Sequence, residues 1–214
     1  YEKGKYFKKD LEKAAEYYKR AADNNNSEAQ NNYGILLQKK ADENPENLEK
    51  GAHYLQLSAE QGNIHGMARY GFALLNGNGV EKNVQKAKEY LKKSADLGYS
   101  FAQFHYGVTL LDHNPSLDVF NKGLRYIKKA INQRNVEAYY TYGKLLLEGH
   151  FIEKNERSAM EYFKMGAEMG HLESMLEYAR CNKEGIGTEK NGEIASKYYH
   201  LASCSSDGNC NANT

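Results

Sequence analysis

Proline, tryptophan and an excess of charge of one sign are scarce or missing in this sequence. Proline occurs only 2 times in 214 residues, and few prolines allow many uninterrupted helices. The 29 Lys and Arg residues balance the 28 Asp and Glu residues, which argues against a dedicated nucleic-acid binder. No apolar run approaches the ~18 residues that a transmembrane helix requires, so we do not expect this segment to insert into a membrane.

Cysteine is also scarce. The three cysteines, Cys181, Cys204 and Cys210, show neither an even count nor a CxxC spacing, so the sequence predicts neither a disulfide framework nor a zinc site. Cys204 and Cys210 could pair in an oxidising compartment. We expect reduced thiols instead, as in a protein of the cytoplasm.

Tyrosine, in contrast, is abundant, and 11 of the 18 copies recur regularly. Tyr-Gly pairs, followed by one Tyr-Ala, recur at steps of 37, 36, 36 and 36 residues, beginning at Tyr33, Tyr70, Tyr106, Tyr142 and Tyr178. A small residue three positions before a tyrosine recurs with the same period, at Tyr17, Tyr54, Tyr90, Tyr126, Tyr162 and Tyr198. Two independent patterns with one period predict a structural repeat, and we interpret these tyrosines as packing residues.

Each repeat predicts two helices. Residues 102–110 illustrate the first pattern, A-x-x-x-Y-G-x-x-L, and residues 86–95 the second, K-A-x-x-Y-x-x-x-(A/S)-A. Small and apolar residues recur at helical spacing in both. The predicted fold is all-α, a right-handed α/α solenoid of stacked antiparallel helical hairpins with about 36 residues per repeat.

The second helices are predicted to end in a left-handed residue. Glycine suits that conformation and stands there at Gly62, Gly98 and Gly170. Asn25 adopts it less easily, and Arg134 is expected to break the rule.

Paired glycines in the stretch LLNGNGVEKN suggest either a phosphate-binding loop or a turn between helices. Gly77 and Gly79 recur as Gly185 and Gly187, 108 residues or three periods later. A phosphate loop has no reason to keep step with a structural repeat, and it opens a helix directly after a strand. We therefore interpret these glycines as turn residues that adopt backbone conformations unfavourable for other residues.

The combined pattern resembles the Sel-one-like repeat (SLR), a relative of the tetratricopeptide repeat, whose consensus is A-x-Y-x-L-G-x-x-Y-x-x-G-x-G-V-x-x-D-x-x-K-A-x-x-Y-x-x-x-A-A-x-x-G. Residues in matching positions are Gly71, Gly77, Gly79, Val80, Lys86, Ala87, Tyr90, Ala95 and Gly98. The consensus aspartate is replaced by Asn83, Asn155 and Asn191, and the repeats that start at Ala29 and Ala102 lack Gly-x-Gly. The resemblance implies an adaptor or scaffold, and it adds the endoplasmic-reticulum lumen as a second possible location beside the favoured cytoplasm.

The register of the repeats predicts the domain organisation. We expect one solenoid domain, with a partial repeat at 1–28 that is complete only in its second helix, and a tail or the start of a further repeat at 210–214. Five full repeats lie between them, at 29–65, 66–101, 102–137, 138–173 and 174–209. The chain is expected to be a piece of a longer array.

No catalytic, cofactor-binding or metal-ligating residues are predicted. The seven histidines share no common position in the repeat, and no HExxH, Gly-x-Ser-x-Gly or Walker sequence is present. The chain is therefore expected not to be an enzyme.

A surface for binding is the stronger prediction, because first helices are expected to line the concave face of a solenoid. Positions two, six and nine after the first-helix alanine lie opposite its packing face. We predict a partner-binding groove there, formed by Asn31, Phe72, Leu75, Phe104, Val108, Tyr140, Lys144, Arg180 and Lys183. Its apolar centre suits a peptide or a partner helix, and its basic end suits an acidic group. The alternative is that these side chains pack against the next hairpin.

Two functions follow from the sequence. The favoured hypothesis is a non-enzymatic scaffold or adaptor that binds a protein or peptide on its concave surface. The alternative is an accessory SLR region of a larger signalling enzyme, of the protein-kinase or ubiquitin-pathway type. The oligomeric state is left open.

Overall fold

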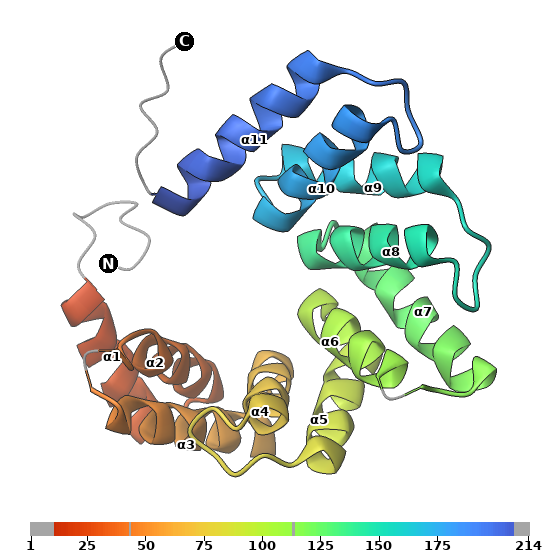
Figure 1. Ribbon diagram of the computed structural model, residues 1–214. Coiled ribbons are helices and arrows are strands. Elements are labelled where there is room, and N and C mark those ends of the chain that lie inside the picture. Colours follow the sequence, from red (N-terminus) through yellow and green to blue (C-terminus); the bar gives the residue numbers. More distant parts are fainter. Residues whose placement is uncertain (1–10, 43, 113, 208–214) are drawn as a thin grey trace. The chain divides into compact units, whose positions relative to one another are not determined.

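The computed structural model of the chain describes residues 11–42, 44–112 and 114–207. Over these residues it contains eleven helices and no strand (Figure 1). The helices are α1 (Leu11–Asp23), α2 (Ser27–Lys39), α3 (Glu46–Glu60), α4 (Ile64–Asn76), α5 (Val84–Asp96), α6 (Ser100–Leu111), α7 (Leu117–Asn132), α8 (Val136–Glu148), α9 (Glu156–Glu168), α10 (Leu172–Glu184) and α11 (Gly192–Asp207). The predicted all-α class is confirmed.

The chain divides into two compact units, one ending at Thr109 and the other beginning at Leu110. In the first unit, α2 packs on α3 and α4 on α5, and the core includes Leu55, Tyr70 and Leu74. In the second, α8 packs on α9 and α10 on α11, around Phe163 and Tyr178. The expectation of one continuous solenoid domain with the repeat boundaries given above stays a prediction.

The Tyr-Gly pairs lie where the two helices of a hairpin come closest. A Cβ atom on Gly143 of α8 would lie 2.6 Å from the ring of Phe163 in α9, which is fully buried. The preceding Tyr142 meets Tyr162 edge-to-face, with ring centroids 4.8 Å apart. Glycine therefore lets the helices approach, and the tyrosines close the contact beside it. The same tyrosine contact joins Tyr33 to Tyr54, Tyr70 to Tyr90 and Tyr178 to Tyr198.

The Gly-x-Gly turns contact the preceding second helix as well as ending the first helix. Gly77 ends α4 in the left-handed conformation, with φ 77°. Gly79 lies so close to the start of α3 that a Cβ atom would overlap the carbonyl group of Leu48. Gly187 has the same relation to the carbonyl group of Glu156 at the start of α9. The second glycine thus brings the turn against the main chain of the preceding second helix.

The turn after α8 keeps only the first of these glycines. Gly149 ends the helix with φ 71°, but Phe151 stands where the other turns have their second glycine. Phe151 also adopts a left-handed conformation, with φ 51°, and 53% of it is exposed. Its ring lies 4.9 Å from that of Phe120 in α7, so an aromatic contact replaces the close main-chain approach.

Asparagines occupy the aspartate position of the SLR consensus and cap the second helices. The side-chain oxygens of Asn83, Asn155 and Asn191 accept hydrogen bonds of 2.9, 2.9 and 3.0 Å from the backbone N–H groups three residues later. Their own N–H groups donate to carbonyl oxygens of the preceding first helices. Since asparagine and aspartate cap helices about equally well, this departure from the consensus preserves the structural role.

The backbone rule at the end of the second helices has no exception at Arg134. Arg134 adopts φ 59° and Asn25 adopts φ 64°, as the glycines do at Gly62, Gly98 and Gly170. The expectation that Arg134 breaks the rule is therefore wrong for its conformation. This conformation costs a residue with a side chain about 1–2 kcal/mol, and Arg134 adopts it nevertheless.

The described cysteines differ from one another. Cys181 is a free, fully buried thiol of α10, and burial raises its pKa to about 11, so it is an unreactive core residue. Cys204 is disulfide-bonded, and the expectation of a reduced thiol is wrong at this position. Cys210, with which the sequence could pair it, lies outside the described residues.

Candidate protein-interaction surface

The five first helices α2, α4, α6, α8 and α10 each present a strip of partly or fully exposed side chains at spacing i, i+4, i+7 and i+11. These residues lie on one helical face, which we term the outer strip. In the first unit it comprises Glu28, Asn32, Ile35 and Lys39 of α2, His65, Arg69, Phe72 and Asn76 of α4, and Phe101, His105 and Val108 of α6. In the second it comprises Glu137, Thr141, Lys144 and Glu148 of α8 and Glu173, Glu177, Arg180 and Glu184 of α10.

The predicted groove coincides with the outer strip only in part. Phe72, Val108, Lys144 and Arg180 belong to the strip. Asn31 and Phe104 are buried, with 5% and 9% exposed. Leu75 and Tyr140 are half-buried, and Lys183 is exposed. The structure thus brings some of these side chains to the surface and packs others away from it.

Burial makes Asn31 and Phe104 poor anchors for a partner. The amide of Asn31 donates to Asn32 Oδ1 at 3.0 Å, while its own Oδ1 has no hydrogen-bond partner among the described residues. Phe104 packs against His105, with ring centroids 5.0 Å apart. The alternative that groove positions pack within the fold therefore holds for these two.

Sequence reasoning missed most of the outer strip, and among the missed residues Arg69, His105 and Glu177 share one position of the repeat. All three stand three positions after the first-helix alanine or its equivalent, between the predicted groove positions. The prediction placed the exposed face at the position two after the alanine; placing it at the position three after the alanine would have included these residues. The signal was the polar character of this position in all five repeats, where Asn32 and Thr141 complete the set.

Aromatic side chains and one guanidinium group form a continuous cluster on the strip of the first unit. The Arg69 guanidinium carbon lies 4.1 Å from the centre of the Phe101 ring, a cation–π geometry. The ring of His105 lies 4.2 Å from Phe101 and 4.5 Å from Phe72. The four residues join α4 to α6.

His105 is neutral at pH 7 in this cluster. Burial and, to a smaller extent, the positive charge of Arg69 together lower its pKa from 6.5 to about 4. The unfolded chain binds this proton near the ordinary pKa, so it holds more protons than the folded chain between pH 6.5 and 4.

Acidification should therefore destabilise the first unit through His105. Between pH 7 and pH 5, we expect the wild-type chain to lose about 1–2 kcal/mol more unfolding free energy than His105→Gln, which cannot take up the proton. Urea unfolding of both proteins at three pH values measures this difference. Equal losses in the two proteins would show that protonation of His105 is not coupled to folding.

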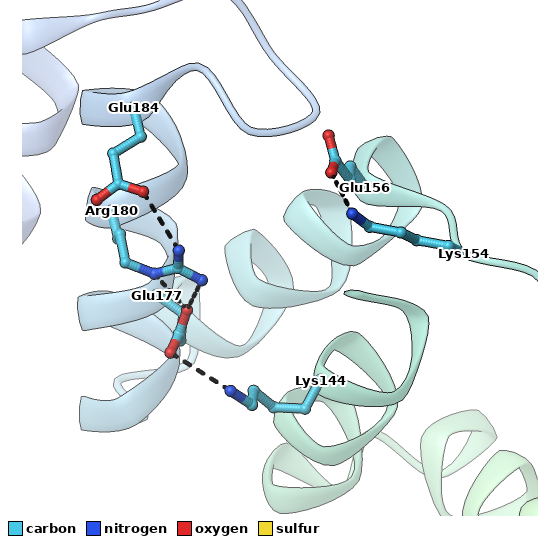
Figure 2. Close-up of polar contacts among 6 residues, drawn as sticks. All are labelled: Lys144, Lys154, Glu156, Glu177, Arg180 and Glu184. Carbon is cyan, nitrogen blue, oxygen red and sulfur yellow. Dashed lines mark hydrogen bonds and ion pairs between the residues drawn. The ribbon is translucent and has the colours of Figure 1, made fainter. Parts of the chain in front are cut away.

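Charged side chains replace the aromatic cluster on the strip of the second unit (Figure 2). Glu177 of α10 accepts hydrogen bonds from the Arg180 guanidinium at 2.7 and 3.0 Å. Arg180 also pairs with Glu184 at 3.3 Å, and Lys144 of α8 reaches Glu177 at 4.0 Å. Of the basic residues of the predicted groove, Lys144 and Arg180 are therefore paired with carboxylates of the same chain, and Lys183 is exposed.

The hollows of the surface lie at the hairpin turns. In the first unit, a hollow of about 540 Å³ lies between the start of α3 and the turn that contains Gly77 and Gly79. In the second, one of about 360 Å³ is lined by α7, α8 and α9, with Tyr142 and Tyr162 in its wall.

The described residues contain no group of three or more His, Cys, Asp or Glu side chains placed to hold a metal ion. Nor is any described helix both long and apolar enough to span a bilayer.

Repeated hairpins, periodic glycines and capped helix starts define an α/α solenoid. The chain belongs to the Sel1 repeat family: the family model for the Sel1 repeat matches residues 1–26, 27–63, 64–99, 136–171 and 172–207. Proteins of this family are repeat proteins without catalytic activity and generally serve as protein-interaction scaffolds. The SLR resemblance read from the sequence is thereby confirmed.

Solved structures support the same fold. A protective antigen of uropathogenic Escherichia coli with an SLR fold is 27% identical, with a TM-score of 0.77, and the match covers 88% of this chain but only 40% of that one. A Sel1 repeat protein from Oxalobacter formigenes is 23% identical (TM-score 0.70; 84% and 71% covered). An immunity protein from Pseudomonas aeruginosa is 16% identical (TM-score 0.65; 93% and 75% covered). No curated protein sequence matches significantly.

Proposed function

We propose that the chain is a scaffold segment that binds a protein or peptide through the outer strips of its first helices, on the side that the sequence assigns to the concave surface. The observation that supports this proposal is a contrast between two sets of positions. The packing positions that define the repeat, as at Ala102, Tyr106 and Gly107, keep a small side chain or tyrosine in every repeat. Strip positions change in chemistry: Phe72, Val108, Lys144 and Arg180 are equivalent.

This contrast indicates that the packing positions serve folding and that the strip positions serve recognition of a partner. The positions where helices come into close contact are constrained by volume, so successive repeats fill them with small residues or tyrosine. A partly exposed position carries no such constraint, and a different side chain in each repeat gives each part of the surface its own specificity. The partly exposed aromatic residues of the first unit are of the kind that anchors protein interfaces.

Site-specific photocrosslinking in source cells tests the proposed surface. A benzophenone amino acid would replace Val108 or Glu173 on the outer strips. Leu97 and Met165, which are 60% and 46% exposed and lie outside the strips, serve as controls in the same two units. We expect a discrete crosslinked protein from the strip positions and none from the controls.

A matching loss of affinity should accompany the crosslinks. Once the partner is identified, the double variant Phe72→Ala, Arg180→Ala should weaken its binding at least about tenfold, with Met165→Ala unchanged. Crosslinks that form only from Leu97 or Met165 would place the partner on another surface and reject the proposal.

A further inference from the structure

We propose that the outer strip of α4 and α6 binds an acidic peptide segment in which a carboxylate stands next to an apolar side chain. This inference rests on the proposed function and specifies the partner chemistry for one part of the same surface.

Charge on this strip is one-sided. Of the seven strip residues on α4 and α6 none is acidic, and Arg69 carries its permanent charge; the strip of α2 adds one acidic and one basic residue, Glu28 and Lys39. The Arg69 guanidinium group forms no hydrogen bond or ion pair with the described residues, and it stacks instead on the face of the Phe101 ring. Stacking occupies a face of the guanidinium group and leaves its N–H edge able to donate.

The second unit contains an arginine, Arg180, that is already paired with carboxylates of the chain. There Arg180 donates to Glu177 and pairs with Glu184, and five of the eight strip residues are glutamates. Arg180 therefore has its carboxylates within the chain, whereas Arg69 has none among the described residues. A carboxylate supplied by a partner would complete the equivalent interaction in the first unit.

The surroundings of Arg69 define the rest of the ligand. Phe72 and Phe101 are half-buried and Val108 is 36% exposed, so an apolar side chain beside the carboxylate would cover them and exclude water. Excluding water strengthens the charge-assisted hydrogen bonds between guanidinium and carboxylate. His105 adds no competing charge at pH 7, because its pKa is lowered to about 4.

Selection of phage-displayed random dodecapeptides on the whole chain tests this inference. We expect the selected peptides to share an Asp or Glu next to Leu, Ile or Phe. Synthetic versions should bind Arg69→Gln at least about tenfold more weakly than wild type, since a charge-assisted pair is lost. Arg69→Lys should fall between the two, because it keeps the charge but not the planar donor pair.

Two controls make the result specific. Arg125→Gln removes an exposed positive charge from the second helix α7 and should leave affinity unchanged. Converting the peptide carboxylate to an amide should weaken binding to wild type but cost no further affinity in Arg69→Gln, because the two groups form one pair.

Several outcomes would overturn the inference. Selected peptides without a carboxylate, or equal affinities for wild type and Arg69→Gln, would reject it. Arg69-dependent self-association in sedimentation without peptide would make a second copy of the chain the occupant instead. Peptides that lose affinity with Lys144→Ala but not with Arg69→Gln would reject this site and leave the proposed function standing, whereas peptides insensitive to every outer-strip variant would count against both.

Discussion

Gly187→Ala is expected to lower the free energy of unfolding by at least about 3 kcal/mol, the sum of overpacking and of a left-handed residue with a side chain. The new Cβ atom would overlap the carbonyl group of Glu156 and lie 2.7 Å from the amide nitrogen of Arg157. Both are main-chain atoms at the start of α9 and cannot rotate away. Either the turn or the helix must move.

Gly170→Ala is the matched control for this prediction. Gly170 has φ 86°, as left-handed as Gly187, but nothing lies within 4 Å of its Cβ position. Its substitution should therefore cost only about 1 kcal/mol. Urea unfolding, together with hydrogen exchange at the start of α9, measures both variants. Equal losses would mean that glycine is needed at Gly187 for its conformation alone.

The sequence predicted the turn but not this contact. The period of 36 residues between equivalent positions assigned Gly77 and Gly79 to a joint between helices, and the left-handed φ values agree. The approach to Leu48 depends on how a turn lies against the preceding second helix, which local sequence does not encode. Phe151 illustrates the limit, since it occupies the equivalent position and makes a ring contact instead.

Gly66→Ala is expected to cost about 2–3 kcal/mol by overpacking. In the first unit, its Cβ atom would lie 2.6 Å from Ser58 Cβ and would overlap Ser58 Oγ. Ser58 is fully buried, and its hydroxyl donates to the carbonyl oxygen of Ser27 at 2.6 Å. Rotation of the hydroxyl away from alanine would break that hydrogen bond.

A double-mutant cycle isolates this contact from other effects. Adding Ser58→Gly to Gly66→Ala should recover about 1–2 kcal/mol relative to the sum of the single effects. Gly192→Ala is the control for helix propensity: its Cβ position is open, so alanine should be neutral or stabilising there. An additive cycle would show that Ser58 does not limit the size of residue 66.

The second unit contains the same contact with the two residues exchanged. Gly166 of α9 faces Ser174 of α10, and a Cβ atom on Gly166 would lie 2.8 Å from Ser174 Cβ. The equivalent residues between α7 and α8 are Ala130 and Ala138, both fully buried. These three junctions hold about the same total side-chain volume, whereas the junction of α5 and α6 holds Ser94 and Ala102, both fully buried. Alanine at position 66 would therefore require α3 and α4 to adopt a wider spacing that accommodates such a pair.

The candidate surface was predicted less completely than the fold. Apolar and small residues directly predict which positions are buried, so their helical periodicity located the packing face. The outer strip had to be assigned by elimination, and a first helix is buried on more than one side, as Phe104 shows. The pairing of Arg180 could have been anticipated from Glu177 and Glu184, which stand three residues before and four after it, spacings at which helical side chains meet.

The contacts of Ser58 with Gly66 and of Gly79 with Leu48 define a building block offset by half a repeat from the sequence motif. Both contacts lie within a segment that runs from α3 through α4 to the end of its Gly-x-Gly turn. The segment from α9 through α10 to the turn with Gly187 contains the same two contacts. Recombination at the motif boundaries would separate residues whose sizes are matched. Crossovers just before the asparagine caps would instead transfer each matched pair intact, so duplication or engineered exchange of repeats should succeed most readily there.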